Sequence, residues 1–113
     1  MAAQFCCVEK NIDGLKKAVD DGKLFSADLK KSVFKTLLEI LWNIGLGKKQ
    51  CLKCFSKNTL KKLKAQRGIL RRILDKSESL KKRRKIFLEA GKGEFKRVIE
   101  NFVLTEFFTN CLE

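Results

Sequence analysis

The sequence contains no proline, no histidine and no tyrosine, and it has one methionine and one tryptophan. The absence of proline removes the strongest helix breaker, and the abundant leucine, lysine and glutamate favour helices throughout. Without histidine the chain lacks the side chain that most often serves as a general base or metal ligand. It also lacks a glycine-rich phosphate loop and an activated serine motif. We therefore expect an all-α protein that is not an enzyme, with no catalytic residues, no metal, no cofactor and no small-molecule substrate.

Long apolar runs are also missing, and Met1 is not followed by a basic and then apolar signal segment. We therefore expect no membrane span and an intracellular protein.

The cysteines are odd in number, and an odd count without a signal segment favours free thiols in a reducing compartment. They are Cys6, Cys7, Cys51, Cys54 and Cys111. Cys51 and Cys54 have CxxC spacing, but zinc needs two more ligands, and the adjacent pair Cys6–Cys7 suits a tetrahedral site poorly.

Basic residues are abundant but unevenly distributed. Residues 48–97 hold nineteen Lys/Arg against four Asp/Glu, a net charge of +15. This exceeds the net charge of the whole chain, +13, because residues 98–113 are acidic and residues 1–47 are nearly neutral. Such a localised excess indicates a binding surface for a polyanion rather than a means of staying soluble.

Apolar spacing predicts a single domain, residues 1–113, folded as a compact bundle of four to five helices. We expect helices over about residues 3–21, from Ser26 to just before Gly45, 58–74, 80–90 and 94–111, with a short helix or irregular turn at 48–55. The second helix is apolar on more than one face, which predicts that it forms the centre of the core.

The residues from 57 to 97 are the candidate nucleic-acid site. Five consecutive basic residues on the first turns of a short helix, Lys81 to Lys85, repel one another and oppose the helix dipole, so folding gains nothing from them. The run also has the composition of a nuclear import signal, so a nuclear location is an open alternative. The predicted contacts are Lys57, Lys61, Lys64, Arg67, Arg71, Arg72, Lys81, Lys82, Arg83, Arg84, Lys85, Lys96 and Arg97.

The predicted helices 58–74 and 80–90, joined by a five-residue turn, have the lengths of a helix-turn-helix pair. The second helix carries no Asn or Gln to read adenine, and lysines mostly hold phosphate. We therefore expect contacts mainly to the phosphate backbone, with little sequence preference.

The stretch from Leu63 to Gly91 resembles small basic proteins of Maverick/Polinton-type, adintovirus-like DNA elements. The shared features are a basic, leucine-rich helix, a short turn, and then Leu80-Lys-Lys-Arg-Arg-Lys followed by an apolar triplet and a glycine. The likeness covers about a quarter of the chain. Those proteins continue with a second glycine and a membrane-like tail, whereas this chain continues with Lys92 and an amphipathic aromatic segment. The resemblance implies a viral or mobile-element origin and a role near DNA, which favours DNA over RNA.

Two other functions remain open from the sequence. The basic face could meet an acidic protein, as in a viral modulator of a host factor, or it could lie on an anionic membrane.

The C-terminal segment carries more aromatic surface than one docked helix usually needs. Phe102, Phe107 and Phe108 therefore predict a homodimer interface, which would place two basic faces on one polyanion.

Overall fold

The computed structural model describes residues 12–45 and 53–111, and these residues form six helices and no strand. The all-α prediction is therefore confirmed, and 74% of the described residues are helical. The expected count of four to five helices is slightly too low, because one helix expected to be continuous is divided in two.

The first helix, α1 (Ile12–Asp20), ends as the sequence predicts. Gly22 adopts a left-handed conformation with φ of 67°, which a residue with a side chain rarely adopts. The N–H of Lys23 donates to the carbonyl of Ala18, and the N–H of Gly22 donates to that of Val19. These two bonds form a Schellman motif that satisfies the last carbonyls of the helix. The expected beginning of this helix, residues 3–11, lies outside the described residues.

The second helix, α2 (Lys31–Gly45), begins five residues later than the sequence predicts. The hydroxyl oxygen of Ser26 accepts from the N–H of Asp28, and the Ser26 carbonyl accepts from the N–H of Leu29. Such local bonds compete with helix formation, so Ser26 starts a turn and does not cap a helix. The central position of α2 is as expected, since it buries residues on several faces, among them Phe34, Leu37 and Ile40.

The helix expected at residues 58–74 divides at Gln66 into α4 (Lys57–Ala65) and α5 (Arg67–Ile73). Gln66 has φ of −100° and ψ of 16°, outside the helical region, and its N–H donates to the carbonyl of Leu63. Leu63 and Ile73 are both buried. After the break α4 packs on the C-terminal helix, whereas α5 packs on α6.

The remaining helices have the predicted limits. Helix α6 (Leu80–Ala90) begins after Ser79, whose hydroxyl accepts from the N–H of Lys82, and it is followed by Gly91. The C-terminal helix is continuous and consists of α7 (Glu94–Arg97), the π-helical segment η2 (Val98–Val103), α8 (Leu104–Glu106) and a second π-helical segment, η3 (Phe107–Cys111). Of the region expected as a short helix or turn, residues 53–55 form a turn and the rest lies outside the described residues.

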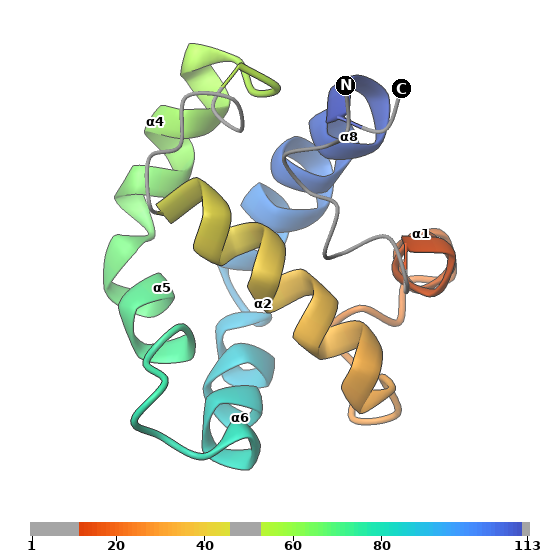
Figure 1. Ribbon diagram of the computed structural model, residues 1–113, viewed down its shortest axis with the longest axis vertical. Helices are drawn as coiled ribbons and strands as arrows, with labels where there is room; N and C mark the ends of the chain where they lie inside the picture. Colours follow the sequence, from red (N-terminus) through yellow and green to blue (C-terminus); the bar gives the residue numbers. More distant parts are fainter. Residues whose placement is uncertain (1–11, 46–52, 112–113) are drawn as a thin grey trace.

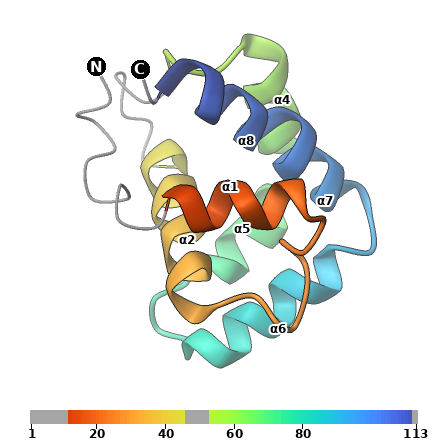
Figure 2. The same ribbon diagram turned by 90° about the vertical axis from the view of Figure 1, so that its right-hand side faces the viewer.

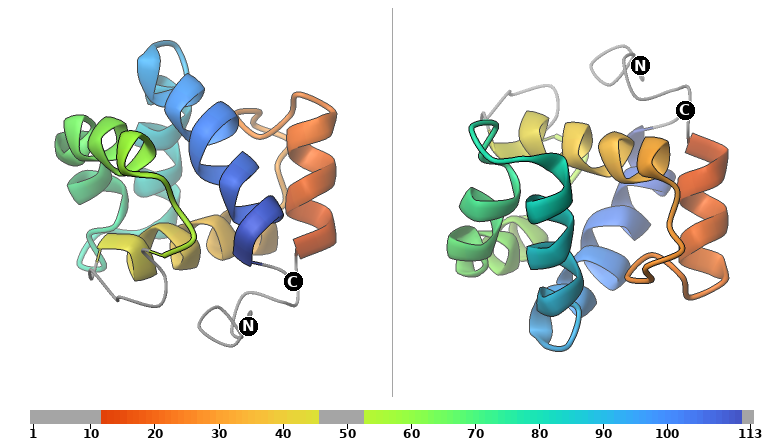
Figure 3. Two further views of the ribbon diagram at one scale, coloured as in Figure 1. Left: turned by 90° about the horizontal axis from the view of Figure 1, so that it is seen from above. Right: turned by 90° about the horizontal axis from the view of Figure 1, so that it is seen from below.

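Helix α2 crosses the middle of the molecule (Figure 1). Helices α4 and α5 lie toward one end of α2 and α1 lies toward its other end, in both views of Figure 3. Figure 2 shows α6 beneath the C-terminal helix, joined to it by the turn at residues 91–93. A cluster of phenylalanines links these parts: the ring of Phe87 stacks on Phe25 at 4.2 Å and meets the edges or faces of Phe34 and Phe95. Phe25 also lies directly over Gly91, where a Cβ atom would come within 2.5 Å of its ring.

Candidate nucleic-acid interface

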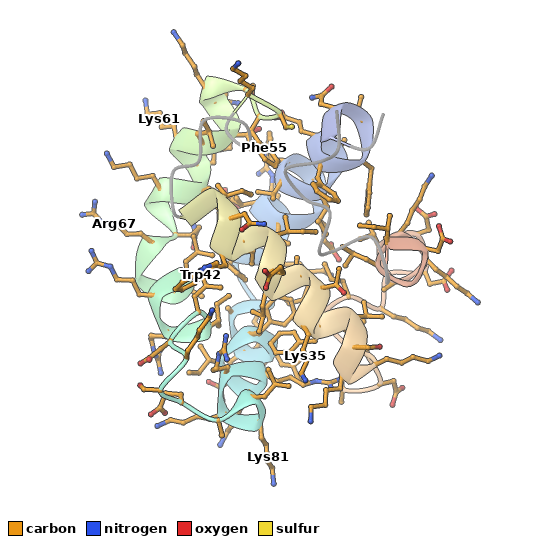
Figure 4. The ribbon with its side chains drawn as sticks, in the orientation of Figure 1. Lys35, Trp42, Phe55, Lys61, Arg67 and Lys81 are labelled. Carbon is orange, nitrogen blue, oxygen red and sulfur yellow. The ribbon has the colours of Figure 1, made fainter. Side chains whose placement is uncertain are left out.

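Helices α4 and α5 present a row of exposed basic side chains, which we call the α4–α5 basic row. Its members are Lys57, Lys61, Lys64, Arg67, Arg71 and Arg72, and all are exposed. Lys57, Lys61 and Lys64 are spaced four and then three residues apart along α4, which places them on one face of the helix. Thr59 and Leu63 are buried on the opposite face. Figure 4 shows Lys61 and Arg67 both pointing outward from this side of the molecule.

The start of α4 is held by a contact with the C-terminal helix. The Glu106 carboxylate accepts hydrogen bonds from the Ser56 N–H at 2.7 Å, the Ser56 hydroxyl at 3.1 Å and the Thr59 hydroxyl at 2.7 Å. The Ser56 hydroxyl oxygen also accepts from the N–H of Thr59 and thereby caps the helix. Burial raises the pKa of Glu106, but these hydrogen bonds outweigh it and leave the pKa below its usual value. The carboxylate also lies near the positive helix N-terminus, which stabilises its charge.

The outer face of α6 carries a second group of basic side chains. Lys81, Lys82 and Lys85 are exposed. They help to line an open depression of about 610 Å³ together with Leu88 and Lys92. In Figure 4 Lys81 points away from the α6 end of the molecule, whereas Lys61 and Arg67 point out from the α4–α5 side. The predicted contacts are therefore divided between two faces.

Arg83 and Arg84 differ from their neighbours in the basic run, because both are half-buried and bonded to backbone carbonyls. Arg83 Nε donates to the carbonyl of Ile73 at 2.7 Å, which ties α6 to the end of α5. Arg84 Nη2 donates to the carbonyls of Ala27 and Leu29 in the segment before α2. These contacts restrain both guanidinium groups more than the sequence predicts, and their role as nucleic-acid contacts stays a prediction. They were also the only arginines on α6 that could read guanine.

The turn between α5 and α6 is fixed by Asp75. Its carboxylate oxygen Oδ1 accepts from the hydroxyl of Ser77 at 2.6 Å and from the N–H of Ser77 at 3.0 Å. The side-chain hydrogen bond from Ser77, supported by the backbone one, lowers the pKa of Asp75. The ionised Asp75 carboxylate therefore stabilises this local turn.

Lys96 and Arg97 are exposed on α7. Arg97 lies 3.9 Å from the carboxylate of Glu94, a weak pair at the surface. The only other ion pair that the described basic residues of 57–97 form joins Lys82 to Glu78 at 2.5 Å. Most of the positive charge in this segment therefore has no acidic partner within the described chain.

The three aromatic residues predicted as an interface have different environments. Phe107 is fully buried in the monomer, so its predicted interface role is corrected to a role in the core. Phe102 and Phe108 are half-buried, and the ammonium of Lys62 lies 4.9 Å from the centre of the Phe102 ring. The homodimer itself remains a prediction that rests on Phe102 and Phe108.

The free-thiol prediction is wrong for Cys54, which takes part in a disulfide. The other cysteines are among the residues whose side chains are not described. Cys54 is buried, and its carbonyl accepts from the Asn110 amide at 3.0 Å, so the start of α4 and the end of the chain are linked here as well as at Glu106.

Trp42 lies on the helix that the sequence predicts as the centre of the core, and the sequence does not show that its ring reaches the surface. The ring is half-buried, and the ammonium of Lys76 lies 4.2 Å from its centre. A lone tryptophan near the end of an apolar helix does not indicate exposure on its own. The folding of α5 beside α2 determines it.

Within the described residues, no group of three or more Cys, Asp or Glu side chains is placed to hold a metal ion, and no helix is both long and apolar enough to span a bilayer. Comparisons with protein-family models, with curated proteins and with solved structures found no match to this chain.

Proposed function

We propose that this protein is a non-enzymatic nucleic-acid-binding protein that contacts mainly the phosphate backbone. The observation that supports this proposal best is the α4–α5 basic row, a set of exposed lysines and arginines on one side of the molecule that have no acidic partner among the described residues. Like charges this close repel one another in the free protein. A polyanion removes that repulsion and releases its own counterions on binding.

Little sequence preference is expected of the basic run on α6. Base reading in the major groove relies on bidentate arginine or amide side chains, whereas lysine acts as a point charge toward phosphate. On α6 the two arginines are bonded to backbone carbonyls, and the exposed side chains of the basic run are lysines. A viral or mobile-element origin, and DNA as the polyanion, remain proposals that rest on the resemblance of residues 63–91.

A salt titration tests the proposal. A protein that neutralises about six to ten phosphates loses roughly 10³–10⁵ in affinity for duplex DNA between about 50 and 200 mM salt. Fluorescence anisotropy with labelled duplexes of two unrelated sequences should show this slope, and the two sequences should bind equally. An affinity that is indifferent to salt would contradict a mechanism based on phosphate contacts.

A matched pair of variants locates the surface. Changing Lys57, Lys61 and Lys64 to Gln removes three charges from the α4–α5 basic row and should lower the salt slope by about 3. Changing Lys16, Lys17 and Lys23 to Gln removes the same charge from exposed positions at and just after α1, toward the other end of α2, and should change the slope much less. Equal losses in both variants would mean that only the net charge matters. Anionic vesicles and an acidic protein, titrated in parallel, test the two other partners considered above.

A further inference from the structure

A groove lies between the C-terminal half of α2 and the α4–α5 pair. Its volume is about 360 Å³, within the range of about 300–1,000 Å³ of small-ligand sites. Leucines from both sides form most of its wall. The residues that line it are Leu41, Trp42, Gly45, Leu63, Arg67, Leu70, Arg71 and Leu74.

The groove adjoins the α4–α5 basic row, because Arg67 and Arg71 belong to both. Both arginines are exposed. Figure 4 shows Trp42 between α2 and α5, with Arg67 projecting outward from the same side. An occupant of this groove therefore meets an aromatic ring and leucine side chains inside and two guanidinium groups at the edge.

The face of the Trp42 ring already attracts a cation, the ammonium of Lys76. Lys76 is exposed, and its flexible side chain can leave the ring easily. Stacking of a base on an aromatic ring generally contributes more than an exposed cation–π contact. A base can thus replace Lys76 on the ring, and the released ammonium can turn to a phosphate.

We propose that the Trp42 groove binds an unpaired base of single-stranded nucleic acid, while Arg67 and Arg71 hold the neighbouring phosphates. The proposal rests on the proposed nucleic-acid function and specifies its preferred ligand. A flat apolar base attached to anionic phosphates matches an apolar groove with two arginines at its edge. In a duplex the bases are stacked on one another and cannot reach the ring. Single strands are therefore bound more tightly than duplexes of equal length.

Trp42 makes the test direct, because it is the only tryptophan in a chain without tyrosine. Its emission reports on this groove alone. The probes are a twenty-residue oligothymidylate, an abasic strand of the same length, a duplex of the same length, and an acidic amphipathic peptide. We expect oligothymidylate to quench the emission and the abasic strand and duplex to leave it nearly unchanged.

Two variants separate stacking from packing. Trp42→Leu keeps an apolar side chain but removes the ring, and it should weaken oligothymidylate binding about tenfold or more while leaving the abasic strand unaffected. Trp42→Phe keeps a ring and should retain most of the affinity. Circular dichroism checks that both variants remain helical. If either variant does not fold, quenching of the wild-type emission by oligothymidylate still tests whether a base contacts Trp42.

The outcomes are distinct. Quenching by oligothymidylate together with the loss in Trp42→Leu supports the proposal. Binding of all strands with unchanged emission overturns it and leaves the proposed function standing, because the phosphates alone then explain affinity. Quenching by the acidic peptide and not by oligothymidylate also overturns it and assigns the groove to a protein. Failure of every nucleic acid to bind overturns both proposals.

Discussion

Arg84 provides the sharpest test of how the basic run is used. Its Nη2 donates to the carbonyls of Ala27 and Leu29, and the side chain is half-buried. We expect Arg84→Met to lower the free energy of unfolding because the variant keeps the apolar stem but leaves both carbonyls without this donor. Lys85→Met is the matched control: it makes the same charge change at the next residue, where the side chain is exposed.

The magnitude follows from the contacts. Hydrogen bonds from a charged donor contribute about 1.5–3 kcal/mol each when buried. Partial exposure lets water replace part of this, so a total of about 2 kcal/mol is reasonable for Arg84. A chain of this length has an unfolding entropy of about 0.24 kcal/mol/K near its midpoint, so Arg84→Met should lower Tm by about 8 °C. Lys85→Met should change Tm by less than about 2 °C, as is usual for surface substitutions.

Thermal unfolding followed by circular dichroism measures both shifts, and DNA anisotropy below the midpoint measures the complementary effect. Lys85→Met should lower the salt slope by about 1, whereas Arg84→Met should change it little. If Arg84→Met melts like the wild-type protein and binds DNA more weakly, the carbonyl contacts are not what holds this side chain. Arg84 would then be a nucleic-acid contact after all.

Two further changes test the C-terminal helix. Glu106→Gln should lower stability by about 1–3 kcal/mol at neutral pH, since a neutral amide accepts the three hydrogen bonds less well. The pKa of Glu106 is lowered in the folded protein, so the stability difference between the wild type and Glu106→Gln is complete above the usual glutamate pKa and disappears as the pH falls through the lowered value. Denaturant midpoints of the two proteins should therefore converge across the acid range, and a constant difference between them would contradict this. Phe107→Ala should cost about 3–5 kcal/mol and Phe108→Ala clearly less, because only Phe107 is fully buried. Phe107→Glu should then unfold the chain, whereas Phe108→Glu should fold and dissociate any homodimer. An interface with a Kd of about 1 μM would be assembled at tens of micromolar. Light scattering that finds the wild-type protein monomeric at that concentration would contradict the homodimer prediction.

Local chemistry determined much of the fold. The limits of α6 follow from Ser79 and Gly91, and the end of α1 follows from Gly22. These residues act through hydrogen bonds and backbone freedom within a few positions, so their effect is visible in the sequence. The periodic apolar residues of α2 likewise predicted its central place, because a helix that is apolar on several faces can only be buried.

Tertiary structure determined what the individual side chains of the basic segment do. The sequence shows Arg83, Arg84 and Lys85 as equivalent members of one run, but only the packing of α6 against α5 and against the segment before α2 brings carbonyls to the two arginines. The same holds for Glu106, whose partners Ser56 and Thr59 lie some fifty residues away in the chain. Periodicity records which face of a helix is apolar and carries no information about which distant atoms that face will meet.

The division of the 58–74 helix and the exposure of Trp42 have the same origin. Gln66 itself has no strong helix-breaking property, and Gly68 two residues later only weakens a helix, so the sequence does not predict where the segment divides. After the division α4 packs on the C-terminal helix and α5 packs on α6. Arg67, Arg71 and Trp42 then line one groove. The sequence determined that the segment is helical and basic on its outer face, whereas the groove depends on long-range packing that brings α5 residues beside the end of α2.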